Sequence, residues 1–324
     1  MSIHEVKPYV VGVDIGGTNT VFGIVNMKGA VVACSIIRTR DYPDVNDYID
    51  TLCNQILLLI QTTCSVEEIR GIGIGAPNGN YYHGTIEYAP NLIWKGIIPL
   101  AKLFQERLGI PTVVTNDANA AAVGEMTYGV ARGMKNFIML TLGTGVGSGI
   151  IVNGQLVYGH DGFAGELGHV IVRREGGRLC GCGRHGCLEA YCSATGVART
   201  AREMLEENDC PSLLRNIPPE SITSKEVYEA ALQGDALAKR VFDFTGHLLG
   251  ESIADFIAVT SPEAVILFGG LSKAGSLLID PLQEAMDKNI LNIFKGKTKI
   301  LVSSLKDADA AVLGASALAW ELGN

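Results

Sequence analysis

The sequence has few basic residues for its length. Its 324 residues include 26 Lys and Arg against 34 Asp and Glu, which gives a net charge of −8 and a pI near 5.3. Proteins that bind nucleic acids or anionic membranes over a broad surface carry an excess of positive charge. The composition therefore argues against both kinds of partner. It does not exclude a small anionic ligand, because loop amides and helix N-termini can hold phosphate locally.

Long apolar runs are also lacking. The chain does not open with the positively charged and then apolar pattern of a signal peptide, and the apolar run at residues 56–60 is too short to cross a bilayer. Eight cysteines are present, but a chain of this length does not need disulfides for stability. We therefore expect a protein of the reducing cytoplasm.

Aromatic residues make up only 6% of the sequence, whereas 39 residues are glycine and 47% are hydrophobic. This balance favours a glycine-rich α/β enzyme over an all-helical protein. The length exceeds that of one typical hydrophobic core, so we expect two domains.

A pattern of strand, glycine turn and strand occurs twice, roughly 130 residues apart. The first copy predicts strands at 9–15 and 20–25, and the second predicts strands at 136–142 and 148–152. Rossmann and Walker loops join a strand to a helix, so this context excludes both. The repeat predicts a duplicated domain core. Further helices are predicted at 44–63, 98–108, 118–128, 237–259, 272–289 and 308–322, and further strands at 69–75, 112–115, 264–268 and 298–302.

The two glycine turns are candidate phosphate-binding loops, because glycine lets backbone N–H groups converge on an anion. An ordinary hairpin bend is the alternative for each turn alone, but equivalent positions in a duplicated core favour two loops that grip one polyphosphate. Asp14, at the end of the first strand, is a candidate Mg²⁺ ligand through water. The candidate phosphate-binding residues are Asp14, Gly16, Gly17, Thr18, Asn19 and Thr20 in the first copy and Gly143, Thr144 and Gly145 in the second.

Asn116 and Asp117 lie where a predicted strand meets a predicted helix. Either side chain is a suitable helix N-cap, which would explain the pair without catalysis. The functional alternative makes Asp117 a general base that deprotonates a substrate hydroxyl during phosphoryl transfer. The two roles are compatible.

Three thiols follow a histidine at short spacing. We predict that His169, Cys180, Cys182 and Cys187 bind zinc, with His185 and Cys192 as substitutes. A disulfide is the alternative, although the expected compartment disfavours it. Four protein ligands leave no open position, so the zinc would be structural and metal-assisted hydrolysis is disfavoured.

Two further loops are candidates for ligand contact. Asn78 lies in the segment GAPNG after a predicted buried strand, and Gly269 and Gly270 join a strand to a helix where a nucleoside could approach the backbone. By composition alone, plain turns explain both loops equally well.

Taken in order, these motifs resemble the ROK sugar kinases, bacterial members of the actin-like ATPase superfamily. The resemblance rests on DIGGTNT, GAPNG, NDANAAAVGE, LGTGVGSG, GFAGELGH and CGCGRHGCLE, and it covers almost the whole chain. Within the family, residues 76–96 are most similar to bacterial glucokinases.

The resemblance implies an α/β fold with two RNase H-like domains around a central cleft and a zinc-binding loop. It places the N-terminal domain at 1–117, completed by a closing helix near 308–324, and the C-terminal domain at 118–307. It implies Mg²⁺-ATP, a structural zinc, glucose as the hexose, and a homodimer or homotetramer. Asp117 would act on the sugar 6-hydroxyl. The implied sugar-binding residues are Asn78, Asn116, Asp117, Glu166, His169 and Glu189.

Two other functions stay open at this point. The same motifs occur in kinases for N-acetylmannosamine, N-acetylglucosamine, fructose or allose. ROK relatives also include sugar-sensing repressors with an N-terminal DNA-binding domain, which we do not expect here because only a short segment precedes Asp14. A pure binding module leaves Asp117 without a purpose beyond capping.

Overall fold

The computed structural model describes residues 7–207, 209–305 and 307–322, and these form two compact units. Unit 1 consists of the described residues in the ranges Met1–Met134, Gln155–Gly165 and Ser304–Asn324. Unit 2 consists of those in the ranges Lys135–Gly154 and Glu166–Ser303.

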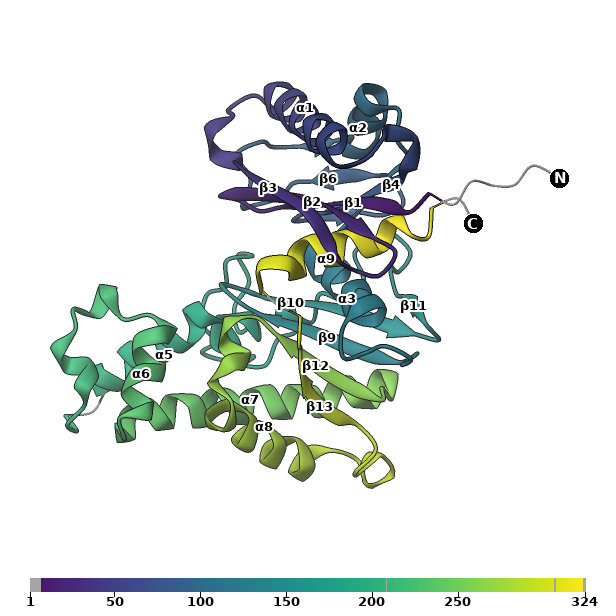
Figure 1. Cartoon of the computed structure of the whole chain (residues 1–324). Coiled ribbons are helices and arrows are strands. Elements are labelled where there is room, and N and C mark those ends of the chain that lie inside the picture. The colour runs from purple at the N-terminus through teal and green to yellow at the C-terminus, as the bar shows by residue number, and fades with distance from the viewer. Residues whose placement is uncertain (1–6, 208, 306, 323–324) are drawn as a thin grey trace. The chain divides into compact units, whose positions relative to one another are not determined.

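Unit 1 is built on a five-stranded sheet in the order β3-β2-β1-β4-β8 (Figure 1). Its first three strands form an antiparallel meander, and β4 and β8 run parallel to β1. The strands are β1 (Tyr9–Ile15), β2 (Asn19–Asn26), β3 (Val31–Arg38), β4 (Ile69–Gly75) and β8 (Thr112–Thr115). β1 and β4 are almost fully buried, as expected for strands with helices on both faces.

Helices α1 (Val45–Thr63) and α2 (Leu100–Leu108) cover one face of this sheet (Figure 1). On the other face lie α9 (Asp307–Ala319) and, packed against α9, α3 (Asp117–Tyr128). The closeness of α9 depends on glycine in the sheet: a Cβ on Gly73 would lie 1.9 Å from the carbonyl oxygen of Ala315. The absence of a side chain at Gly73 therefore lets the C-terminal helix α9 pack closely against the sheet of unit 1.

The boundary of unit 1 differs from the expected domain boundary at residue 117. Residues 118–134 and 155–165 fall in unit 1. Residues 118–128 belong to α3, which packs against α9 within this unit. Residues 323–324 of the predicted closing helix lie outside the described residues.

A small antiparallel sheet in unit 1 was not anticipated from the sequence. It consists of β5 (Gly79–Asn80), β6 (Thr85–Glu87) and β7 (Ile97–Ile98). Strands of two or three residues are too short to show an alternation of apolar and polar residues, so the sequence pattern could not predict them.

Unit 2 repeats the strand order of unit 1. Four strands of unit 2 run in the order β10-β9-β12-β13, with β10 antiparallel to β9 and with β12 and β13 parallel to β9, which matches β2-β1-β4-β8 of unit 1, as the repeat predicts. These strands are β9 (Phe137–Leu142), β10 (Val146–Val152), β12 (Ala264–Phe268) and β13 (Lys299–Val302), whereas the residues of β11 (Gln155–Leu156) fall within unit 1.

The helices of unit 2 pack around its main hydrophobic cluster. They are α4 (Glu189–Cys192), α5 (Ala194–Glu207), α6 (Ser224–Leu232), α7 (Ala236–Thr260) and α8 (Ser276–Asn289). The single helix predicted at 272–289 is wrong at its start. A 3₁₀-helix, η6 (Gly270–Ala274), comes first, and Gly275 at φ +57° separates it from α8. Short 3₁₀-helices also occur at η1 (Thr39–Asp41), η2 (Val66–Glu68), η3 (Leu167–His169), η4 (Leu213–Asn216), η5 (Pro219–Ser221) and η7 (Asn292–Phe294).

Within the described part of the chain, no helix combines the length and the apolar character that crossing a membrane requires.

Candidate active site and metal centre

In unit 1, the acidic candidates lie at one edge of the sheet. β1, β4 and β8 are parallel neighbours, so their carboxyl ends meet at the same edge. Asp14 is the penultimate residue of β1, and Asn116 and Asp117 follow β8 directly. The fold therefore brings together residues about a hundred positions apart, at the edge where α/β sheets commonly bind ligands.

The negative charge of Asp117 acts on the carboxyl group of Asp14. Asp14 is partly buried, and desolvation together with the negative charge of Asp117 raises its pKa to about 7. A carboxylate held in this way is a candidate partner for a divalent cation, because hard cations prefer oxygen ligands. The residues fit the predicted Mg²⁺ role of Asp14.

Asp117 is the first residue of α3, and Asn116 is its N-cap. The side-chain oxygen of Asn116 accepts a hydrogen bond from the Ala118 amide at 2.9 Å, and the same amide donates to Asp117 Oδ1 at 2.8 Å. Desolvation raises the pKa of Asp117, while the amide hydrogen bond opposes that change. Solvent still reaches the Asp117 side chain, which limits the desolvation. Capping is thus present, and the carboxyl remains accessible to a substrate.

The first glycine loop, residues 16–19, joins β1 to β2. The Gly16 amide donates to the carbonyl of Asn19 at 2.9 Å, and Thr18 and Asn19 are exposed. Thr20 is different. It is fully buried, and its hydroxyl bonds to Thr39 Oγ1 at 2.9 Å and to the Tyr48 hydroxyl at 2.6 Å. The Thr20 hydroxyl thus has two hydrogen-bond partners in the core of unit 1, and phosphate binding by Thr20 stays a prediction.

Asn78 lies in a tight loop between β4 and β5. It adopts a left-handed conformation at φ +51°, which asparagine tolerates better than most residues. Its side-chain amide donates to the carbonyl of Glu87 at 2.9 Å. The loop is tied to the end of β8 by a hydrogen bond from the Ala76 amide to the Thr115 carbonyl at 2.9 Å. Asn78 therefore belongs to the same edge as Asp117.

The second glycine loop, residues 143–147, lies in unit 2 between β9 and β10. The Ala194 amide donates to the Gly143 carbonyl at 2.8 Å, and Thr195 Oγ1 donates to the Thr144 carbonyl at 3.1 Å. The start of α5 thus fixes the loop. Sequence reasoning missed Thr195, and no local motif marks it, because the contact joins residues 51 positions apart.

Glu189 connects this loop with the cysteine segment. One carboxylate oxygen, Oε2, accepts from the Val146 amide at 2.9 Å. The other, Oε1, lies 3.4 Å from Cys180 Sγ. The Glu189 carboxylate therefore connects the second glycine loop with the cysteine segment. The sequence predicts sugar binding for Glu189 but did not indicate this connecting role.

Glu166 and His169 flank the short helix η3. This helix lies against β10, because the Leu167 amide donates to Ser148 Oγ at 3.0 Å. The contact requires glycine: a Cβ on Gly168 would lie 2.0 Å from the Val146 carbonyl oxygen. Glu166 is exposed, and His169 is partly buried. Unit 2 therefore brings these two residues beside the second glycine loop.

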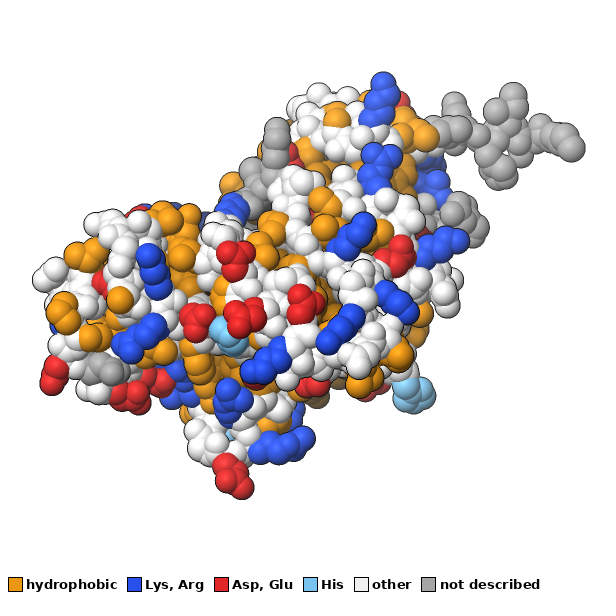
Figure 2. All heavy atoms as spheres, turned by 90° about the horizontal axis from the view of Figure 1, so that it is seen from below, with side chains coloured by type: hydrophobic (Ala, Val, Ile, Leu, Met, Phe, Trp, Pro, Cys, Tyr) orange, Lys and Arg blue, Asp and Glu red, His pale blue; other side chains and the backbone are white. Residues whose placement is uncertain are grey.

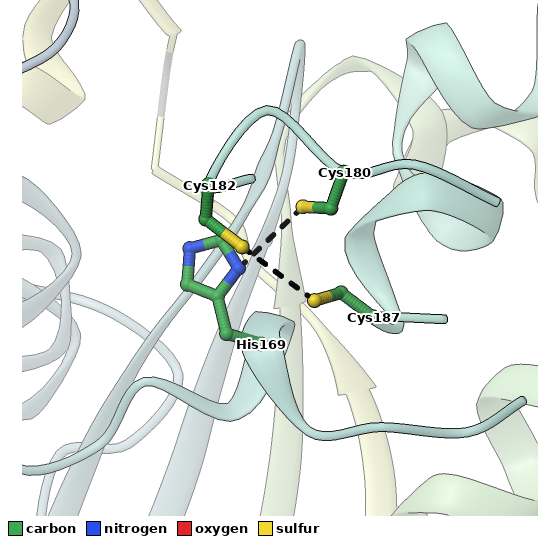
Figure 3. Close-up of side chains that lie close together, drawn as sticks. All are labelled: His169, Cys180, Cys182 and Cys187. Carbon is green, nitrogen blue, oxygen red and sulfur yellow. Dashed lines mark hydrogen bonds between the residues drawn. The ribbon is translucent and has the colours of Figure 1, made fainter. Parts of the chain in front are cut away.

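His169, Cys180, Cys182 and Cys187 form one cluster (Figure 3). Their ligand atoms all lie within 4.8 Å of one another. The distance from Cys182 Sγ to Cys187 Sγ is 3.7 Å, and that from Cys180 Sγ to His169 Nδ1 is also 3.7 Å. A tetrahedral zinc with Zn–S bonds of about 2.3 Å requires S···S edges of about 3.8 Å and slightly shorter S···N edges. The donor set and its spacing fit a closed zinc site.

The two substitute ligands lie elsewhere. His185 Nδ1 is 3.0 Å from the Gly177 carbonyl oxygen, and buried Cys192 is directed to the Thr245 carbonyl. Neither belongs to the cluster.

Gly269 and Gly270 follow β12 in unit 2. Gly269 has φ +100°, and a Cβ there would lie 2.6 Å from the carbonyl oxygen of Leu142, the last residue of β9. The two glycine segments of unit 2 therefore adjoin one another, as a shared nucleotide-binding edge requires.

Comparison with known protein families shows to which family the chain belongs. The sequence profile of the ROK family matches residues 10–321. The chain belongs to the ROK family. The fold is therefore that of a ROK protein, on the actin-like α/β scaffold.

Individual relatives of this ROK chain include enzymes and regulators. A glucokinase of Halalkalibacterium halodurans is 37% identical over 94% of this chain and 93% of its own. The crystal structure of a ROK family glucokinase from Streptomyces griseus, in complex with glucose and AMPPNP, matches with a TM-score of 0.79 and 33% identity over 97% of this chain and 99% of its own. A xylose repressor of Caldicellulosiruptor bescii is 28% identical over 95% of this chain and 77% of its own.

Proposed function

We propose that this protein transfers the γ-phosphoryl group of ATP to the 6-hydroxyl of glucose. The chain is an ATP-dependent hexose kinase of the ROK family. The observation that carries glucose as the substrate is the near full-length similarity to glucokinases, at 37% identity for the H. halodurans enzyme. An oligomeric kinase, a dimer or tetramer, remains part of the prediction.

Asp117 is proposed as the general base. Its carboxyl is solvent-accessible at the N-terminus of α3, and its raised pKa makes it a better proton acceptor than an ordinary aspartate. The base would take the proton from the sugar hydroxyl as the oxygen attacks phosphorus. Phosphoryl transfer needs this positioning and charge neutralisation more than covalent catalysis.

Asp14 is the residue proposed to hold Mg²⁺ through water. The Asp14–Asp117 pair concentrates negative charge at the edge of the first sheet, which favours a cation there. When bound, Mg²⁺ neutralises charge on the phosphoryl oxygens. The two glycine loops and Gly269–Gly270 are proposed to hold the phosphates and nucleoside through backbone amides.

The sugar hydroxyls are assigned to amide, carboxylate and imidazole groups. Such groups discriminate between epimers, because a misplaced hydroxyl leaves a polar partner unpaired. The proposed sugar-binding residues are Asn78, Asn116, Asp117, Glu166, His169 and Glu189.

His169 supports a specific role for the zinc. Its Nδ1 faces Cys180 in the cluster, which leaves Nε2 for a sugar hydroxyl. A metal on one ring nitrogen fixes the tautomer and orientation of the other. The zinc would therefore orient a sugar ligand without touching the substrate.

A coupled ADP-release assay with Mg-ATP tests the substrate assignment. The panel contains glucose, mannose, fructose, allose, N-acetylglucosamine and N-acetylmannosamine. We expect the highest kcat/KM for glucose. Preference for another hexose would keep the kinase but overturn the assigned sugar.

A sugar-responsive regulator is the second candidate, favoured by the repressor relative that matches 95% of this chain. Turnover separates the two functions. Zinc-replete protein that binds a hexose but releases no ADP with any member of the panel would support the regulator and overturn the kinase.

A further inference from the structure

A cavity in unit 1 lies away from the edge that carries Asp14 and Asp117. Its volume is about 500 Å³, which suits a small metabolite. The turn after β2, the C-terminal end of α3 and the region of α9 form its walls. This cavity has no part in the proposed reaction.

Two aromatic rings line the cavity, those of Tyr128 and Trp320. The indole Nε1 of Trp320 donates a hydrogen bond to the hydroxyl of Tyr128, which fixes the two rings relative to each other. Leu313 adds apolar surface. Fixed aromatic surfaces of this kind stack on a planar base or cover the apolar face of a sugar ring.

Two cationic side chains, Lys28 and Arg132, also line the cavity, and both residues are exposed. Among the described residues, neither forms an ion pair, and no described acidic residue lines the cavity. Ammonium and guanidinium groups without a carboxylate partner are the usual ligands of phosphate.

The charge pattern elsewhere differs. On the face drawn in Figure 2, basic and acidic side chains are interspersed. A second cavity, of about 590 Å³ in unit 2, is lined by Arg178 and Arg199, but Glu203 forms ion pairs with both. Two of its arginines are therefore already paired, and Glu175 and Glu207 line it as well, whereas no described acidic residue lines the unit 1 cavity.

The elements that border the cavity lead directly to the proposed active site. α3 begins at Asp117 and ends at Tyr128, and β2 begins at Asn19 in the first glycine loop and ends just before Lys28. A ligand in the cavity contacts the far end of both elements. When a ligand binds at one end of a helix, a small shift of the helix can move the residues at its other end.

We propose that this cavity is an effector site for a small organic phosphate with a ring body. Lys28 and Arg132 bind the phosphate, and Tyr128 and Trp320 contact the ring. A nucleoside monophosphate and a sugar phosphate share this chemistry, and the test distinguishes them.

The sequence contains only two tryptophans, which gives a direct measurement. In the Trp94→Phe variant, Trp320 is the sole indole, and its fluorescence reports on the cavity. The full-length protein is first saturated with glucose and AMPPNP to occupy the proposed active site. AMP, glucose 6-phosphate and inorganic phosphate are then titrated separately.

We expect a saturable fluorescence change with AMP or glucose 6-phosphate, and the more effective probe identifies the source. The double substitution Lys28→Ala and Arg132→Ala should weaken that binding at least about ten-fold, because both charge-assisted hydrogen bonds to the phosphate are lost. Lys239→Ala with Arg240→Ala, an exposed pair on α7, is the charge-matched control and should bind normally.

Three results would overturn the proposal. They are no saturable response to either organic phosphate, an unchanged response in the Lys28/Arg132 variant, or an equal response to inorganic phosphate. The effector role has its own test: the bound probe must change kcat in wild-type protein and not in the Lys28/Arg132 variant. Binding with unchanged turnover would refute regulation while leaving the kinase proposal intact.

Discussion

The two glycine loops occupy the same place in a duplicated sheet but differ in their chemistry. In unit 1 the last strand pair before the loop is Ile15 with Thr20, and in unit 2 it is Leu142 with Val146. One residue before each pair stands Asp14 in the first copy and Thr141 in the second. Asp14 supplies a negative charge near Asp117, whereas Thr141 accepts a hydrogen bond from the Gly147 amide at 3.1 Å.

The means of anchoring differ as well. The second loop is held by Glu189 and by the start of α5, next to the Cys/His cluster. The first loop has no metal-type cluster beside it among the described residues. From this difference we predict separate roles for the two units: unit 1 carries the proposed general base and Mg²⁺ ligand, and unit 2 holds ligands on a fixed framework.

Among the substitutions that test these separate roles, Asp117→Asn should lower kcat the most. The amide keeps the shape of the side chain but cannot accept the hydroxyl proton, so kcat should fall by about 10²–10⁴-fold. Glucose binding, measured by calorimetry, should remain detectable. Asp255→Asn, an exposed position on α7, is the control and should keep normal turnover. Near-normal kcat in the Asp117 variant would remove the general base from unit 1.

Cys182→Ser tests the framework of unit 2. Losing one of four ligands should remove most of the zinc, measured as metal per chain, and should raise KM for glucose because His169 loses its orientation. A lower Tm is also expected, since a bound structural metal stabilises the fold. Cys34→Ser, at an exposed cysteine outside the cluster, should retain metal and stability. Full metal content in the Cys182 variant would refute the ligand set.

Local patterns predicted most of the fold and the metal cluster, because both depend on short-range spacing. β1, β4, β8 and β12 have the predicted bounds, and the four predicted metal ligands span only 19 residues. The contacts of the Thr20 hydroxyl could not be predicted from the loop motif, because its partners Thr39 and Tyr48 lie 19 and 28 positions away. The role of Glu189 toward Val146 likewise joins residues 43 positions apart, beyond the reach of any local motif.

Asp14→Asn should stabilise the protein in Mg²⁺-free buffer while lowering kcat. The folded-state pKa of Asp14, about 7, lies above its ordinary value of 3.8, so the folded state binds more protons between these values. Wild-type stability from this group is thus fully present below about pH 4 and is lost as pH rises through 7. Asparagine does not ionise, so the variant does not lose this stability at high pH. Its free energy of unfolding should exceed that of the wild type by on the order of 1–4 kcal/mol, and its Tm by a few degrees.

Thermal unfolding at pH 5 and pH 8 measures this difference. The gain in Tm of the Asp14 variant over wild type should be larger at pH 8. Asp41→Asn, at an exposed aspartate, should show no such gain. An equal gain at both pH values would mean that ionisation of Asp14 does not destabilise unit 1, and the contrast between the loops would lose its electrostatic basis.

Thr141→Val should have the smallest effect, because it alters only one hydrogen bond of the second loop. Valine keeps the shape of threonine but leaves the Gly147 amide without its acceptor, a loss of about 1 kcal/mol. If the loop holds phosphate through its backbone, this loosening raises KM for ATP about five-fold and leaves KM for glucose nearly unchanged. Thr62→Val on α1 makes the same chemical change far along the chain and should alter neither constant. A larger change in KM for glucose than for ATP would assign the second loop to the sugar and reverse the division between the two copies.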